Sequence, residues 1–134
     1  MKNEKVPSNR PVSKEFDLED RLVSFACLCL EICDLLPKST AGHNLQYQLS
    51  KCGTAAALIY GEAQAAESGA DFIHKLKMVL KEIKGSRVNI KIIRKKPFLA
   101  HAKVEMGYSE SGELMAIFLK SIETAKSNND KLKK

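Results

Sequence analysis

Residues 18–36 read LEDRLVSFACLCLEICDLL, and the spacing of their apolar side chains decides the fold class. The side chains recur at alternating steps of four and three, which is typical of one face of an α-helix: Leu18, Leu22, Phe25, Cys29, Ile32 and Leu36. Pro37 ends this helix. The helix is also apolar outside the stripe, at Val23, Cys27, Leu28, Leu30 and Leu35. Because this apolar surface is wider than one core needs, we expect a second buried face.

A second long helix is predicted after the break at residues 37–40, since the same periodicity resumes at Leu45, Leu49, Cys52, Ala56, Ile59, Ala63 and Ala66. Beside this stripe runs a row of small residues at intervals of four: Gly53, Ala57, Gly61 and Ala65. A glycine inside a helix costs about 1 kcal/mol relative to alanine. Either another backbone approaches closely and offsets this cost, or the glycines are tolerated at the surface.

The remaining sequence predicts two more helices. Ser68 and Asp71 form a capping box that starts the third, and Pro97 ends it. Its core stripe is Ile73, Leu76, Leu80, Ile83 and Ile90. Residues 97–109 show no sustained period, and the sequence Gly-Tyr-Ser at 107–109 is typical of a turn. We therefore expect the fourth helix to begin at Ser111 and to end near Lys126.

These elements predict an all-α protein with one domain. The length of 134 residues, with 44% apolar and 28% charged residues, suits a single globular domain. Short links favour antiparallel neighbours, so we expect an up-down-up-down antiparallel four-helix bundle over residues 17–126. Residues 1–16 are expected to form a flexible N-terminal tail, and residues 127–134 a polar, basic C-terminal tail.

Neither a membrane span nor a secretion signal is predicted. The longest apolar run is far shorter than the roughly 20 residues that cross a bilayer, and the N-terminus lacks the apolar core of a signal peptide. We therefore expect a cytoplasmic protein. In a reducing compartment the four cysteines, Cys27, Cys29, Cys33 and Cys52, are expected to pack as small apolar side chains.

The chemistry-bearing residues form no recognisable catalytic or metal-binding motif. On a helix, Cys27 points about 200° away from Cys29, so the cysteine cluster cannot converge on one ion. His43, His74 and His101 are scattered along the chain, and no P-loop, zinc-protease or nucleophile-elbow motif is present. We predict no catalytic residue, no metal and no cofactor, and hence a non-enzymatic protein.

Positive charge is concentrated in the third predicted helix. The chain carries a net charge of +6, and residues 70–96 hold nine basic and two acidic residues, which leaves the remainder at −1. Helical spacing places Lys77, Lys81, Lys84, Lys91 and Lys95 on one face, with Val88 filling the gap. This stripe either binds a phosphate backbone or is a solvated helix face. The candidate nucleic-acid-binding residues are Lys77, Lys81, Lys84, Arg87, Lys91, Arg94 and Lys95.

No aromatic residue interleaves with these cations in the sequence, so contacts with phosphates are expected rather than base stacking.

Three segments resemble the "four helix bundle protein" family, which is encoded in intervening sequences of 23S ribosomal RNA genes. They are IYGEAQAAES at 59–68, DFIHKLK at 71–77 with Leu80-Lys81-Glu82, and ELMAIFLKSIETAK at 113–126. The resemblance covers residues 18–126. The sequence departs from the family in the middle of the third helix, where relatives often carry Glu-Thr and aromatic residues and this chain has Gly85-Ser86 and Val88-Asn89.

The resemblance implies a homopentamer without catalytic residues. A protein that looks like a relative, the accessory variability determinant of diversity-generating retroelements, binds nucleic acid and a reverse transcriptase through a basic pentamer surface. The candidate oligomer interface is Gly53, Ala57, Gly61, Glu62, Ala65, Leu28 and Leu35. Glu62 either pairs with a basic residue of a neighbouring subunit or faces solvent.

The sequence thus favours a homo-oligomer that binds RNA or DNA phosphates through the third helix. The alternative is a structural oligomer that binds a protein partner, with no role in nucleic-acid binding.

Overall fold

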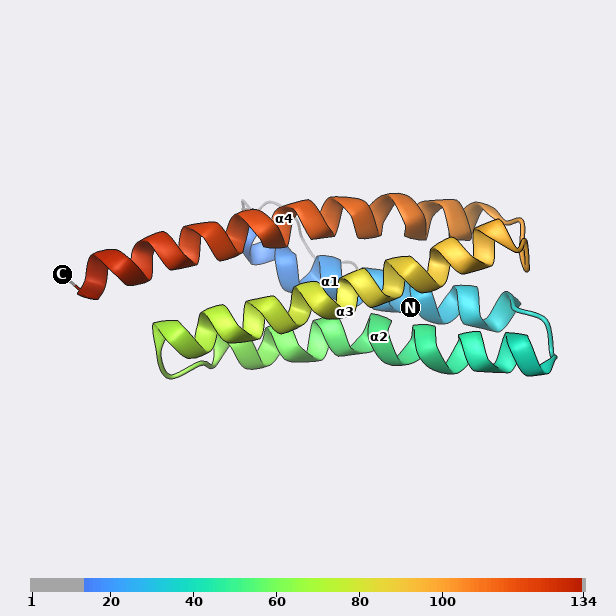
Figure 1. The fold of residues 1–134 in the computed structure, drawn as a ribbon, viewed down its shortest axis with the longest axis horizontal. Helices are drawn as coiled ribbons and strands as arrows, with labels where there is room; N and C mark the ends of the chain where they lie inside the picture. The colour runs from blue at the N-terminus through green and yellow to red at the C-terminus, as the bar shows by residue number, and fades with distance from the viewer. Residues whose placement is uncertain (1–13, 134) are drawn as a thin grey trace, which may run out of the picture.

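The computed structural model describes residues 14–133, which form four α-helices joined by short links (Figure 1). The helices are α1 (Lys14–Leu35), α2 (Thr40–Gln64), α3 (Gly69–Lys95) and α4 (Ala102–Lys133). Consecutive helices run antiparallel and pack on one another, and α4 also packs on α1. The predicted all-α, up-down-up-down antiparallel four-helix bundle is confirmed.

Serine side chains cap the N-termini of the two middle helices, α2 and α3. The Oγ of Ser39 accepts a hydrogen bond from the backbone N–H of Gly42 at 3.1 Å, and the Oγ of Ser68 accepts one from Asp71 at 3.1 Å. Such caps satisfy backbone donors that have no partner within the helix. The predicted start of the third helix at Ser68 is therefore confirmed.

The core runs along the bundle axis between all four helices. Its largest fully buried side chains are Phe25 of α1 and Phe118 of α4. The ring of Phe118 meets that of Tyr60 edge to face, with centroids 5.6 Å apart. Tyr60 and Gly53 occupy buried positions of α2 that the predicted stripe assigned to Ile59 and Cys52, both of which are only partly buried.

The start of the fourth helix was predicted wrongly. Helix α4 begins at Ala102 rather than Ser111, and Gly107 is a buried helical residue instead of part of a turn. A Cβ atom at Gly107 would lie 3.1 Å from the Cδ1 atoms of both Ile32 and Ile90. The glycine therefore permits close packing of α4 on α1 and α3, a reason that local sequence does not reveal.

The ends of the chain differ in part from the predicted tails. Residues 1–13 lie outside the described part of the chain, and residues 14–16 are helical. Residues 127–133, expected as a tail, continue α4, which projects past the link between α2 and α3 (Figure 1). Within residues 14–133 no helix has the length and apolarity required to cross a membrane.

Candidate nucleic-acid interface

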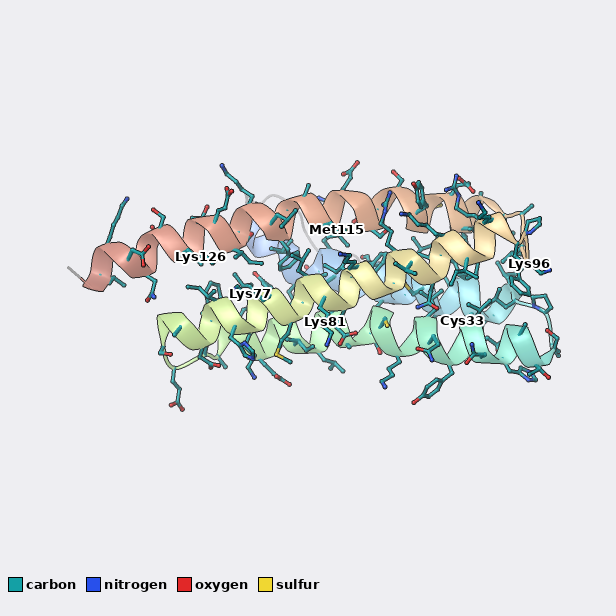
Figure 2. All side chains as sticks on the ribbon, in the orientation of Figure 1. Cys33, Lys77, Lys81, Lys96, Met115 and Lys126 are labelled. Carbon is teal, nitrogen blue, oxygen red and sulfur yellow. The ribbon has the colours of Figure 1, made fainter. Side chains whose placement is uncertain are left out.

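Helix α3 presents five exposed lysines on one side, here called the lysine face: Lys77, Lys81, Lys84, Lys91 and Lys95. Figure 2 labels Lys77 and Lys81 along the first half of the helix. Val88 fills the gap in the series and is 47% exposed, so the whole row faces outward. None of the five lysines forms an ion pair with another residue of the described chain.

Arg87 does not belong to the lysine face. Its Nη1 donates to the backbone carbonyl oxygen of Tyr108 at 2.6 Å and to the Oγ of Ser111 at 3.2 Å, so the side chain points toward α4. Gly112 provides the space, because a Cβ there would lie 2.5 Å from the same Nη1. Arg87, one of the candidate nucleic-acid-binding residues, therefore joins two helices and directs its Nη1 to α4.

Arg94 also turns toward α4. Its Nε donates to Oε2 of Glu105 at 3.0 Å, and its Cζ lies 3.9 Å from the ring centroid of Tyr108. The Cζ of Arg87 lies 4.0 Å from the same centroid. Since residues 87 and 94 are about two helical turns apart, the ring lies between the two guanidinium groups. Hydrogen bonding to Glu105 raises the pKa of Arg94, which stays protonated at any physiological pH.

Tyr108 and Glu105 are functional candidates that the sequence did not reveal. No aromatic residue lies among the lysines in the sequence, but Tyr108 of α4 contacts two arginines of α3 in the folded bundle. Together with Lys91, Arg94 and Lys95 these two residues line a shallow depression, here called the α3–α4 groove. Three cations and one carboxylate give it an excess of positive charge.

The row of small residues along α2 and at its C-cap, Ala65, divides into two halves. Gly53 is buried, and a Cβ there would lie 2.8 Å from both Cβ and Sγ of Cys29. Ala57 packs against the core. Gly61 and Ala65 are exposed, and a Cβ at Gly61 would meet nothing within 4 Å. The close approach inferred for Gly53 is thus made by α1 of the same subunit, whereas Gly61 and Ala65 remain open.

Glu62 has a partner within its own subunit. Its Oε1 accepts a hydrogen bond from Nζ of Lys75 at 3.0 Å, and its side chain is 58% exposed. The same bond raises the pKa of Lys75. Glu62 thus faces solvent, which is one of the two alternatives predicted for it, and it also forms an ion pair within its own subunit.

The wide apolar face of α1 remains partly uncovered. Val23, Leu30 and Leu35 are each more than 40% exposed, and Leu28 is partly buried. Leu28, Val23 and Met106 line an open depression between α1 and α4 that also contains Cys27. Ion pairs connect α1 to α4 beside it, from Arg21 to Glu110 at 2.7 Å and from Lys103 to Glu31 at 3.2 Å.

The cysteines are free thiols in different surroundings. Cys29 and Cys33 are buried and Cys52 is partly buried, as expected of small apolar side chains, whereas Cys27 is exposed. Burial raises the pKa of Cys29 and raises that of Cys33 to about 11. Between residues 14 and 133 no group of three His, Cys, Asp or Glu side chains is arranged to hold a metal ion.

The four packed helices define an all-α bundle protein, and a solved structure of the same fold shows the likeness. It is a protein of unknown function from the S23 ribosomal protein family of Bacteroides thetaiotaomicron, with a TM-score of 0.72 and 23% sequence identity. The match covers 78% of this chain and 97% of that one. No protein-family model and no curated protein matches the sequence. The likeness establishes the fold.

Proposed function

We propose that the protein is a non-enzymatic, cytoplasmic homo-oligomer that binds the phosphates of RNA or DNA through the lysine face of α3. The observation that carries this proposal is the row of five exposed lysines without an acidic partner in the described chain. Charges that are not neutralised within the subunit can displace the counterions of a phosphate backbone, which is the main source of sequence-independent affinity.

The same proposal includes membership of the four helix bundle protein family and assembly as a homopentamer. The fold shared with an S23 ribosomal protein family member supports the family, and the quoted sequence resemblance implies the pentamer. The apolar positions exposed on α1, including Leu35, and the open small residues Gly61 and Ala65 are available for subunit contacts. Leu28 lies in the α1–α4 depression and extends that apolar surface.

A protein-binding oligomer is the second candidate function. The apolar depression between α1 and α4 favours it, since exposed apolar surface of this kind is typical of sites that bind other proteins. In that case the lysine face contributes solubility alone.

A charge-reversal experiment tests the proposal. Purified, nuclease-treated protein is titrated with structured RNA and with duplex DNA, alongside the triple variant Lys77→Glu, Lys84→Glu and Lys91→Glu. The matched control reverses three exposed lysines elsewhere: Lys38, Lys120 and Lys126. Both variants change the net charge equally, so a loss confined to the first locates binding on α3.

Sedimentation measurements first establish that all three proteins have the same oligomer size. Micromolar or tighter binding at low salt that only the α3 variant loses supports the proposal. Equal losses in both variants, or no binding, would refute it.

A further inference from the structure

The α3–α4 groove adds a shallow depression to one end of the lysine face. Lys91 and Lys95 belong to both surfaces, whereas Arg94, Glu105 and Tyr108 belong to the groove alone. Three cations converge there with one carboxylate.

Arg94 is held in place before any ligand arrives. The face of Tyr108 supports its guanidinium at 3.9 Å, and Glu105 binds only its Nε. A side-chain hydrogen bond with Tyr108 also contributes to the raised pKa of Arg94, and the remaining Nη donors can bind a ligand in the groove. A planar guanidinium in a fixed position offers paired donors that match the oxygens of a phosphate, and a flexible lysine does not.

Arg87 holds the Tyr108 ring in place from the side opposite Arg94. It lies against the ring of Tyr108 and is itself anchored by the backbone carbonyl of that residue. Both sides of the ring are therefore covered by guanidinium groups. A nucleobase cannot stack on Tyr108, so the groove offers charge and hydrogen-bond donors but no stacking surface.

We propose that the α3–α4 groove binds one phosphate group, with Arg94 as the directed donor and Lys91 and Lys95 as the neighbouring charges. This inference rests on the proposed function, since it names the point on the lysine face at which a phosphate is held most firmly. Tyr108 is a positioning residue that keeps Arg94 in place, and Glu105 competes with the phosphate for Arg94.

The role of Glu105 makes the proposal distinctive, because removing this acid is expected to improve binding. Glu62 provides a matched control. Each forms one ion pair of 3.0 Å with a basic residue of α3, and the two side chains are 61% and 58% exposed. Glu105→Gln and Glu62→Gln therefore remove the same charge and the same kind of contact, but only Glu105 lines the groove.

Affinities for a short RNA duplex at low salt test the assignment. Arg94→Gln is expected to weaken binding about tenfold, as the loss of a charge-assisted hydrogen bond predicts. Glu105→Gln is expected to tighten binding severalfold, and Glu62→Gln to change it less. Tyr108→Phe keeps the ring and binds like the wild type, whereas Tyr108→Leu behaves like Arg94→Gln. Thermal melts of each variant establish that it is folded.

A second measurement distinguishes the source of the phosphate. Backbone amide signals of residues 91–95 and 105–108 are followed by NMR while inorganic phosphate, and separately the duplex, is added. Saturable shifts with inorganic phosphate assign the groove to a free phosphate, and shifts with the duplex alone assign it to the nucleic-acid backbone. If neither inorganic phosphate nor the duplex shifts these amide signals, the proposal is overturned.

Different results would refute the phosphate site in the groove and nucleic-acid binding by the lysine face. The triple variant Lys77→Glu, Lys81→Glu and Lys84→Glu alters the lysine face outside the groove. If it abolishes duplex binding while Arg94→Gln and Glu105→Gln bind like the wild type, the groove assignment is wrong and the proposed function stands. If the wild-type protein binds no duplex, the proposed function fails, and the titration with inorganic phosphate still decides the groove.

Discussion

The Nη1 atom of Arg87 lies 2.6 Å from the backbone carbonyl oxygen of Tyr108. This hydrogen bond joins α3 to the first turns of α4, and the two arginines of α3 differ in this respect from the five lysines of the lysine face. Arg87 and Arg94 contact α4, whereas the five lysines face outward. The division follows from chemistry, because a guanidinium stacks on rings and donates in several directions, and an ammonium is more strongly hydrated.

Arg87→Ala is expected to destabilise the subunit by about 1.5–3 kcal/mol, the range for hydrogen bonds to charged groups. Two hydrogen bonds and the contact with the ring are lost together. Urea unfolding monitored by circular dichroism measures the change. Lys84→Ala, an exposed change on the same helix, is the control and is expected to stay within about 0.5 kcal/mol of the wild type. Equal stabilities for the two variants would show that Arg87 does not connect the helices.

Gly53→Ala is expected to destabilise the subunit by about 1–3 kcal/mol through overpacking. The added methyl group would lie 2.8 Å from Cβ and Sγ of Cys29, so α1 and α2 must move apart. The better helix propensity of alanine offsets only about 1 kcal/mol. Thermal and urea unfolding measure the change, and a variant as stable as the wild type would contradict this packing.

Gly61→Ala is expected to leave the subunit folded and to weaken its assembly. In the subunit the added methyl group meets nothing within 4 Å, whereas in the proposed oligomer it separates two subunits. Sedimentation velocity over a range of concentrations measures the effect. Gln48→Ala, at another exposed position of α2, is the control. Assembly as strong as in the control would remove Gly61 from the interface.

Stability is expected to fall as the pH rises from about 9 to 11. Burial raises the pKa of Cys33 from an ordinary value of 9.0 to about 11, so the unfolded chain loses this proton at a lower pH than the folded protein. The contribution is complete below pH 9 and is lost as the pH rises through the folded value. Urea midpoints at pH 8, 9.5 and 11 measure it. The urea midpoint of the Cys33→Val variant should decline less steeply with pH than that of the wild type. Identical slopes for the two proteins would show that the Cys33 thiol does not cause the decline.

The bundle could be predicted from the sequence where helical periodicity and local caps carry the information. The stripe from Leu18 to Leu36 and the cap at Ser68 are local features, and both appear in the structure as expected. The start of α4 could not be predicted, because Gly107 serves a contact with Ile32 and Ile90 that depends on the packed bundle. In isolation the same glycine is typical of a turn.

In the candidate site, too, the features set by local sequence could be predicted and those set by packing between helices could not. The lysine face depends only on helical spacing, so the sequence places all five lysines correctly on an exposed side of α3. The groove depends on Tyr108 and Glu105, which approach α3 because α4 begins at Ala102. The sequence contains one signal for the contact between Arg87 and α4. Tyr108 is followed by Ser111, whose Oγ accepts a hydrogen bond from Arg87, and by Gly112, which leaves space for the guanidinium group.

The salt dependence of duplex binding tests the central claim most directly. The logarithm of the affinity for duplex DNA is measured against the logarithm of the salt concentration for the wild type and for the Lys77, Lys84 and Lys91 to Glu variant. Each phosphate contact contributes about 0.9 to the slope, so the loss of three contacts should reduce it by up to about 2.7. A wild-type slope that this variant leaves unchanged would contradict the proposal that the lysine face binds nucleic acid.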